Sequence, residues 1–353
     1  MQYHLLGRSG LRVSELALGT MTFGPDWGWG ADRETSKAIF DAYAEAGGNV
    51  IDTANRYTEG TSEEYVGDFI SADREHFVVA TKYTLYEREG DPNGAGNHRK
   101  NMRHSVEQSL RRLDTDYIDL LWVHAWDFTT PVEEVMRGLD DLVRQGKVLY
   151  VGISDTPAWV VSQANMLADQ RGWTPFSALQ LRYSLIDRAA ERDLLPMARS
   201  LDLAVTPWSV LGAGVLTGKY NRDNPPEDGR AAGGAATVER NLEIAETVID
   251  IADEVGASPS QVALRWAMQR PGLILPLVGA RTEEQIHDNL GALDIELSDD
   301  HMETLNEVSN IDLGFPHDFL QEDGIRNVVY GGTYDNIINH RHNGRQRQRA
   351  SST

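Results

Sequence analysis

The sequence predicts a parallel (β/α)8 TIM barrel, preceded by a β-hairpin and carrying extra helices after the seventh and eighth strands. Eight short, nearly continuous apolar runs alternate with helical patterns between residues 16 and 292, and strands that are buried on both faces have this composition. The chain has 353 residues, a length that single domains often reach as barrels. A doubly wound open sheet is the alternative fold. It is disfavoured because the first strand-to-helix turn, Gly19–Gly24, lacks the Gly-x-Gly-x-x-Gly spacing of a dinucleotide-binding turn.

The predicted elements follow one another regularly. The hairpin spans residues 3–14, around the turn Gly7–Gly10. Strands are expected at 16–20, 49–52, 77–82, 117–124, 148–153, 178–181, 203–206 and 273–278. Helices are expected at 33–46, 62–71, 101–113, 132–144, 157–169, 189–200, 238–255, 259–269, 282–292 and 298–308. A glycine-rich insertion at 211–236 interrupts this rhythm.

Residues 1–336 are expected to form one domain. The segment 311–336 contains enough aromatic and branched residues to pack on the barrel, and we expect it to lie across one face. Residues 337–353 are expected to be a disordered basic tail, because from His340 onward there is no acidic residue and there are four arginines. A nucleic-acid-binding arm is the alternative for this tail.

The charge balance limits the partners. Acidic residues number 54 against 33 basic ones, for a net charge of −21, which repels nucleic acid and anionic membranes. The apolar runs are too short to span a membrane and the first residues do not resemble a leader, so a cytoplasmic protein is expected. The chain has no cysteine, which rules out disulfides and thiolate ligands. The excess of acid indicates either a merely soluble, arginine-rich enzyme or adaptation to concentrated salt.

Four chemically active side chains follow predicted strands. Asp52 ends the second strand and Tyr57 lies five residues later, while Lys82 ends the third strand and His124 ends the fourth. The carboxyl ends of barrel strands share one mouth, so these groups would form a proton-donating site with the phenol as acid. A nearby ammonium favours the phenolate and would lower the tyrosine pKa. The alternative for each residue alone is a helix cap or a solvent-facing side chain.

Motifs in this order resemble those of the aldo-keto reductase superfamily from Gly19 to Asn289. The matching segments are Leu18–Met21, Asp52-Thr53-Ala54-x-x-Tyr57, Thr81-Lys82, His124, Gly152–Ser154, Gln180–Ser184, Trp208-Ser209-x-Leu211, Gly214–Tyr220 and Gly279–Thr282 with Gln285 and Asn289. The segment Leu216–Tyr220 looks more like the bacterial and potassium-channel β-subunit branch than the aldose reductase branch. The resemblance implies a nicotinamide cofactor, NADPH with NADH as the alternative, and no Rossmann domain.

The resemblance also implies residue roles. Tyr57 would be the general acid, Lys82 and Asp52 a pair that lowers its pKa, and His124 the group that orients the carbonyl. Tyr183 would stack on the nicotinamide, Ser154 and Gln180 would hold its carboxamide, and the segment after the seventh strand would wrap the pyrophosphate. The implied cofactor-binding residues are Gly19, Thr20, Met21, Asp52, Ser154, Asp155, Gln180, Tyr183, Trp208, Ser209, Val210, Leu211, Gly214, Leu216, Lys219, Gly279, Ala280, Arg281, Gln285 and Asn289.

Two of these positions carry particular expectations. Arg281 precedes the last barrel helix, where an arginine matches an adenosine 2′-phosphate and indicates NADPH; the alternative is an ion pair with Glu284 or Asp288. Asp155 stands where the family commonly has Asn. It accepts a hydrogen bond as Asn does, but as a carboxylate it cannot donate one and it adds negative charge.

The substrate is expected to be a small aldehyde or ketone. Trp27, Trp29, Tyr86 and Trp126 lie in loops after the first, third and fourth strands, where they would form aromatic walls; ordinary loop packing is the alternative. Two other functions remain open. One is a cofactor-sensing regulatory subunit of the same fold, and the other is a metal-dependent barrel hydrolase or isomerase using ligands from His4, His76, His98, His104 and His124.

Overall fold

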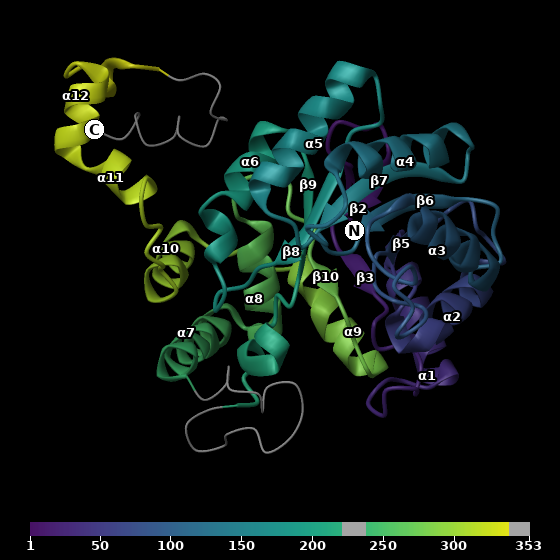
Figure 1. Cartoon of the computed structure of the whole chain (residues 1–353). Coiled ribbons are helices and arrows are strands. Elements are labelled where there is room, and N and C mark those ends of the chain that lie inside the picture. The colour runs from purple at the N-terminus through teal and green to yellow at the C-terminus, as the bar shows by residue number, and fades with distance from the viewer. Residues whose placement is uncertain (221–237, 339–353) are drawn as a thin grey trace. The chain divides into compact units, whose positions relative to one another are not determined.

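The computed structural model describes residues 1–220 and 238–338. The chain divides into two compact units, Met1–Asn310 and a second unit that begins at Ile311. The first unit contains an eight-stranded sheet with the order β10-β3-β4-β5-β6-β7-β8-β9. Figure 1 shows helices arranged around these strands. The predicted (β/α)8 barrel and the hairpin before it are therefore confirmed.

Neighbouring barrel strands pair in parallel throughout. Nearly all of their residues are buried, which explains why each strand reads as an apolar run rather than an alternating one. The strands are β3 (Ala17–Gly19), β4 (Val50–Asp52), β5 (Val78–Tyr83), β6 (Ile118–Val123), β7 (Val148–Ser154), β8 (Ala178–Arg182), β9 (Ala204–Trp208) and β10 (Leu277–Val278).

The ends of the sheet meet between β9 and the segment before β10. Val205 bridges Ile274, with its N–H donating to Leu273 O at 2.9 Å and its carbonyl accepting from Leu275 N–H at 2.8 Å. The strand predicted at 273–278 is shortened to β10, since Pro276 has no N–H to continue a ladder. The carbonyl of Pro276 still accepts from Ala17 N–H at 3.0 Å.

The helices lie where the 3.6-residue patterns place them, with one exception. The helix predicted at 189–200 begins later than expected: the chain forms a short 3-10 turn, η2 (Ala189–Glu191), and then α6 (Leu194–Ser200). Pro196 explains the break, because it is tolerated in the first turn of α6 but not in the interior of a longer helix. The other helices of this unit are α1 (Arg33–Glu45), α2 (Thr61–Ile70), α3 (Arg99–Arg112), α4 (Val132–Arg144), α5 (Ala158–Arg171), α7 (Glu239–Val255), α8 (Pro259–Met268), α9 (Glu283–Leu290) and α10 (Asp299–Val308).

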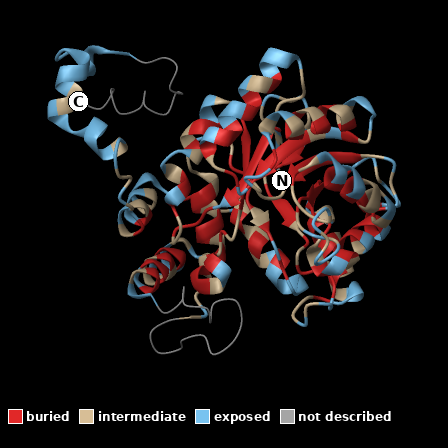
Figure 2. Cartoon of the chain, in the orientation of Figure 1, coloured by how far each residue is buried: buried red, intermediate tan, exposed pale blue. Residues whose placement is uncertain are grey.

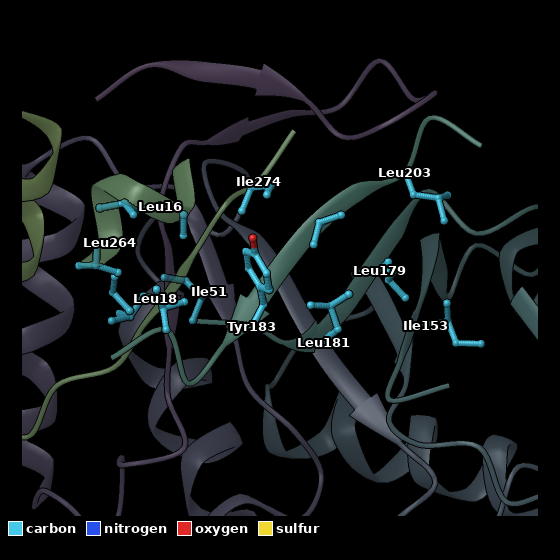
Figure 3. Packing of buried hydrophobic residues seen from close by; sticks show 14 of the residues in the cluster. Leu16, Leu18, Ile51, Ile153, Leu179, Leu181, Tyr183, Leu203, Leu264 and Ile274 are labelled. Atoms are coloured by element: carbon cyan, nitrogen blue, oxygen red, sulfur yellow. The ribbon is translucent and has the colours of Figure 1, made fainter. Parts of the chain in front are cut away.

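The core has two layers. One large cluster fills the space between strands and helices, and Figure 3 shows part of it, including Leu18, Ile51 and Leu179. A smaller cluster lies inside the barrel and includes Leu6 and Val13 of the hairpin. Figure 2 shows burial concentrated in the strands and in the helix faces turned toward them.

The hairpin closes the amino end of the barrel. It consists of β1 (Tyr3–Leu5) and β2 (Arg12–Ser14), which pair antiparallel. Gly7 in its turn has φ +53°, and a Cβ there would collide with the carbonyls of Ser177 and Asp202, just before β8 and β9. With this end filled by apolar side chains, a polar site is left to the carboxyl ends of the strands.

The second unit contains α11 (His317–Gln321), α12 (Asp323–Tyr330) and η7 (Tyr334–Asn336), none of which buries a residue. The placement of 311–336 across the barrel and its membership of a single domain stay predictions. The predicted tail at 337–353 falls outside the described residues from 339 onward. None of the helices in the described parts of the chain is long and apolar enough to cross a membrane.

The barrel wall predicts the effect of one substitution. Gly152 in β7 faces the indole of Trp122 in β6, and an added Cβ would overlap that ring. Gly152→Ala should therefore lower the free energy of unfolding by about 1–3 kcal/mol, measured by urea denaturation. Gly10→Ala is the matched control, since nothing lies within 4 Å of a Cβ at that turn. Equal stability of both variants would contradict this picture of the wall.

Candidate active site

The four predicted catalytic residues meet at the carboxyl end of the barrel. Asp52 ends β4, Lys82 lies near the end of β5 and His124 directly follows β6. Tyr57 begins the 3-10 turn η1 (Tyr57–Gly60), in which Thr58 and Glu59 have positive φ. Because the three strands are neighbours in the sheet, side chains distant in sequence gather around one opening.

A buried ion pair forms the floor of this opening. The Lys82 ammonium is fully buried and contacts Asp52 Oδ2. It also donates a hydrogen bond to Thr53 O at 2.8 Å, while Gln180 Nε2 donates to Asp52 Oδ1 at 3.0 Å. A charge pair without water requires such additional hydrogen bonds to offset its desolvation.

The Tyr57 ring lies directly over this pair. Lys82 Nζ is 4.6 Å from the centroid of the ring. Burial raises the pKa of Tyr57, the Lys82 ammonium lowers it and the Asp52 carboxylate raises it again, so that the pKa lies above its ordinary value. The ammonium and the carboxylate therefore act on the phenol in opposite directions. The structure pairs Lys82 with Asp52 as expected, and the role of this pair in lowering the Tyr57 pKa stays a prediction.

Asp52 also keeps the lysine charged. Burial alone would lower the pKa of Lys82, but the Asp52 carboxylate, together with the Tyr57 hydroxyl, outweighs burial and raises it. The ammonium therefore persists at the base of the site. The pKa of the Tyr57 phenol is the combined result of burial and of the opposed charges of Lys82 and Asp52.

His124 completes the opening beside Tyr57. The two ring centroids are 6.0 Å apart at an interplanar angle of 86°. The half-buried imidazole has a pKa lowered to about 3, because of its enclosure and the charge of Lys82. Its Nδ1 is buried without a hydrogen-bond partner among the described residues. A neutral imidazole of this kind can donate a hydrogen bond to an oxygen without bringing a second cation.

Sequence reasoning missed a polar network behind the site. Arg112 in α3 donates to Glu63 Oε2 at 2.6 Å and to Glu87 Oε1 at 3.0 Å. Glu87 also accepts from Asn55 Nδ2 at 3.3 Å, and Glu63, fully buried, accepts from Thr81 Oγ1. The network therefore links the loop that carries Tyr57 to the strand that carries Lys82. The available signal was an acidic residue, Glu63, inside an otherwise apolar helix face.

Arg56 is a second missed residue at the opening. Its guanidinium is paired with Glu59, donates to the Tyr86 hydroxyl at 2.9 Å and stacks 4.5 Å from the Tyr86 ring centroid. Glu59 also accepts from Trp27 Nε1 at 3.0 Å. These contacts join the loops after β3, β4 and β5 beside Tyr57.

Ser154, Asp155 and Trp208 lie together at the ends of β7 and β9. Asp155 has φ +40°, its N–H donates to Gln180 O at 3.3 Å, and its Oδ1 accepts from Trp208 Nε1 at 3.2 Å. Ser154 Oγ is buried without a hydrogen-bond partner in the described chain. An orphaned hydroxyl beside a half-buried indole suits a planar ligand with a polar amide.

The role predicted for Tyr183 is wrong. Its ring is fully buried and stacks on Trp266, with centroids 5.2 Å apart. Its hydroxyl donates to Glu191 at 2.6 Å and accepts from Arg270 at 3.1 Å. Figure 3 shows Tyr183 within the apolar cluster. A ring held in this way has no free face for a nicotinamide, whereas the Trp208 ring is half-buried.

Most of the other predicted cofactor residues lie in the segments that follow β3, β9 and β10. Thr20, after β3, donates from Oγ1 to Asp52 O at 3.0 Å, with Gly19 and Met21 on either side. After β9 the chain turns through η3 (Gly212–Thr217), where Gly214 has φ +98° and a Cβ would collide with Lys219. Ser209 and Leu211 are half-buried, whereas the side chains of Val210 and Leu216 are buried in the core, so these last two can offer a ligand only their backbone.

The segment Gly279–Thr282 joins β10 to α9. Thr282 caps this helix, and Arg281 N–H donates to Gln285 Oε1 at 2.9 Å. Asn289 is buried and donates to Gly279 O at 3.4 Å, while Ala280 O accepts from Thr22 at 2.6 Å. The Arg281 side chain is exposed, and within residues 1–220 and 238–338 it forms no ion pair with Glu284 or Asp288. The structure therefore does not show the ion pair that was the alternative prediction for Arg281.

The predicted aromatic walls are partly assembled. The rings of Trp27 and Trp29 lie 5.6 Å apart, Tyr86 is 39% exposed and Trp126 packs against the core. The metal-dependent alternative gains no support, since in the described part of the chain no three His, Asp or Glu side chains group as a metal site requires.

Comparison with known proteins identifies the family. The aldo/keto reductase family matches residues 15–310. The chain belongs to the aldo/keto reductase family.

An aryl-alcohol dehydrogenase (NADP+) of Phanerodontia chrysosporium is 41% identical, with 92% of this chain and 91% of that protein covered. A norsolorinic acid reductase of Aspergillus flavus is 41% identical over 91% of this chain and 84% of its own. An aryl-alcohol dehydrogenase of Pestalotiopsis microspora is 37% identical, with 95% of this chain and 90% of that protein covered. The channel-subunit branch suggested by the sequence stays a prediction.

Membership of this family defines the reaction type. The protein is an NADPH-dependent oxidoreductase that acts on small carbonyl compounds, interconverting aldehyde or ketone and alcohol. The cofactor prediction of NADPH is confirmed at this level.

The lowered pKa of His124 predicts how the free energy of unfolding varies with pH. Its folded pKa of about 3 lies below the ordinary value of 6.5, so between these values the unfolded chain binds a proton that the folded chain refuses. Stability is lost as the pH falls below about 6.5, with this residue contributing up to about 1.4 kcal/mol per pH unit. Urea denaturation between pH 7 and pH 5 should show a shallower loss for His124→Gln than for the wild type.

His76→Gln is the control for this comparison, because that histidine is exposed. It should keep the wild-type slope. Identical slopes for all three proteins would show that His124 is accessible to protons in the folded state.

Proposed function

We propose that the protein reduces aromatic aldehydes or ketones to alcohols with NADPH, using Tyr57 as the proton donor. The observation that carries this proposal is the half-buried phenol lying over the buried Lys82–Asp52 pair with the His124 ring set edge-on beside it. No other group of acids and bases described above combines a proton donor, a fixed cation and a neutral imidazole. The relatives named for aryl alcohols and norsolorinic acid, together with Trp27, Trp29, Tyr86 and Trp126, support an aromatic substrate.

The chemistry of the residues follows from where charge develops. NADPH, when bound, supplies the hydride to the carbonyl carbon. Negative charge then builds on the carbonyl oxygen, and the Tyr57 hydroxyl donates its proton there. The neutral His124 donates a hydrogen bond to the same oxygen and positions it. Lys82 stabilises the phenolate that remains, and Asp52 and Gln180 keep Lys82 in place.

The residues around the opening fit this cofactor. Ser154 offers an unpaired hydroxyl for the carboxamide and Trp208 offers a ring face for the nicotinamide. Glycines and positive φ values after β9 allow backbone N–H groups to approach a pyrophosphate, with Lys219 above Gly214. Arg281 stands exposed before the N-terminus of α9, where a 2′-phosphate would find a planar fork of donors.

A cofactor-sensing subunit is the second candidate. The retention of Asp52, Tyr57, Lys82 and His124 in one site favours turnover over sensing. The two functions separate in one assay, because a sensor would bind NADPH and yet fail to oxidise it with any member of a panel of aromatic aldehydes.

Removing the phenol tests the proposed acid. Tyr57→Phe should lower the rate of carbonyl reduction by roughly a hundredfold or more, while NADPH binding, followed by cofactor fluorescence, stays nearly unchanged because the ring is kept. Lys82→Met should act in the same direction by removing the charge that favours the phenolate. Retention of more than about a tenth of the wild-type rate by Tyr57→Phe would reject Tyr57 as the proton donor.

Cofactor choice tests the role of Arg281. A charge-assisted contact contributes about 1.5–3 kcal/mol, so Arg281→Ala should weaken NADPH binding roughly ten- to hundredfold and leave NADH binding nearly unaltered. Titration calorimetry with each cofactor measures both. Arg8→Ala, at an exposed position in the hairpin, is the control for loss of a positive charge. Equal losses for NADPH and NADH would place the 2′-phosphate elsewhere.

The acidic composition is proposed to reflect adaptation to concentrated salt, and the absence of cysteine agrees with a reducing compartment such as the cytoplasm. Salt shortens the Debye length from about 10 Å at 0.1 M to about 3 Å at 1 M and so screens self-repulsion. The melting temperature, followed by circular dichroism, should therefore rise markedly as KCl goes from tens of millimolar to molar. An unchanged or falling melting temperature would leave only the merely soluble, arginine-rich interpretation.

A further inference from the structure

Asp155 places a fixed carboxylate at the opening of the barrel. The residue follows β7 and is exposed there. Its φ of +40° is unusual for a residue with a side chain. Two contacts hold it: its N–H donates to Gln180 O at 3.3 Å, and its Oδ1 accepts from Trp208 Nε1 at 3.2 Å. The carboxylate is thus oriented by β8 and β9 while remaining open to a ligand.

The charge of Asp155 belongs to the same electrostatic environment as the catalytic residues. It interacts with Lys82 and with Arg182, and it acts on the Tyr57 phenol in the direction that raises the pKa of Tyr57. Arg182 is partly committed elsewhere, since it pairs with Asp187 at 2.6 Å. The negative charge of Asp155 therefore acts on the catalytic residues and is only partly neutralised by Lys82 and Arg182.

The neighbours of Asp155 indicate what this charge would meet. Ser154, with its unpaired hydroxyl, and the ring of Trp208 are the groups proposed above to hold the nicotinamide. The nicotinamide ring is neutral in NADPH and carries a positive charge in NADP+. A hydrogen bond from the carboxamide to residue 155 would be similar in both forms, whereas attraction to a carboxylate exists only in the oxidised form.

We propose that the carboxylate of Asp155 makes the protein bind NADP+ more tightly than NADPH; this inference rests on the proposed function. Because positive charge appears on the ring as the hydride leaves, the same attraction assists carbonyl reduction. It also retains NADP+ after the reaction and makes this product a strong inhibitor.

A purely structural role would predict something different. If Asp155 served only to fix the Trp208 indole, an asparagine would do equally well. Its side-chain oxygen accepts the same hydrogen bond from Nε1, and Asn tolerates positive φ as Asp does. Asp155→Asn therefore removes the charge and keeps the geometry, which makes it the decisive variant.

The experiment measures the dissociation constants of NADP+ and NADPH by titration calorimetry for the wild type and three variants. Asp155→Asn should weaken NADP+ binding about tenfold, equivalent to about 1.4 kcal/mol, and leave NADPH binding nearly unchanged. Asp155→Glu retains the charge and should keep most of the preference. Glu303→Gln, at an exposed position of α10, controls for the loss of one negative charge from the protein.

The outcomes separate the two proposals. Equal effects of Asp155→Asn on both cofactors, or no effect on either, would overturn the role of Asp155 while leaving the proposed function intact. Failure of the wild type to bind either cofactor would instead overturn the proposed function. If Glu303→Gln weakened NADP+ binding as much as Asp155→Asn, the effect would come from the net charge of the protein and not from the position of Asp155. This outcome would also reject the proposal.

Discussion

The buried contact between Lys82 and Asp52 constrains everything around it. An ammonium taken fully out of water costs several kcal/mol unless it is paired and hydrogen-bonded, and here Asp52, Thr53 O and the support of Gln180 meet that requirement. These groups come from β4, the loop after it, β5 and β8. The barrel must therefore bring these elements into register before the charge can be buried, so the site and the fold depend on the same few hydrogen bonds.

Opposed charges give the site its properties. Lys82 favours the phenolate of Tyr57, whereas Asp52 disfavours it and at the same time keeps Lys82 charged. His124 stays neutral because burial, and after it the adjacent charge of Lys82, lowers its pKa. Asp155 adds a further negative charge at the rim. Removal of any one of these charges changes the protonation balance of the others, so their contributions are not additive.

Sequence periodicity was enough to predict the barrel and the strand ends that carry Asp52, Lys82 and His124, because apolar runs and their polar ends are local features. Periodicity did not predict the side-chain contacts between residues that are far apart in the sequence. The sequence does not reveal that Tyr183 turns into the core to meet Trp266 and Glu191. Nor does it reveal that Arg112 of α3 reaches Glu63 of α2 and Glu87 of the loop after β5. Pro196 and Pro276 were visible in the sequence, but the helix break and shortened strand also depend on their neighbours.

The seam between β9 and β10 has a consequence for how ligands affect the whole barrel. The ring of strands closes there through a bridge at Val205 and Ile274 and a two-residue β10. The chain segments that leave this seam on either side are 209–219 and 279–289, both proposed to hold one dinucleotide. A molecule bound to both would connect the two sides of this seam, where a single bridge joins the strands. Occupancy would then suppress local opening of β10 and α9, as well as adding its binding free energy to global stability.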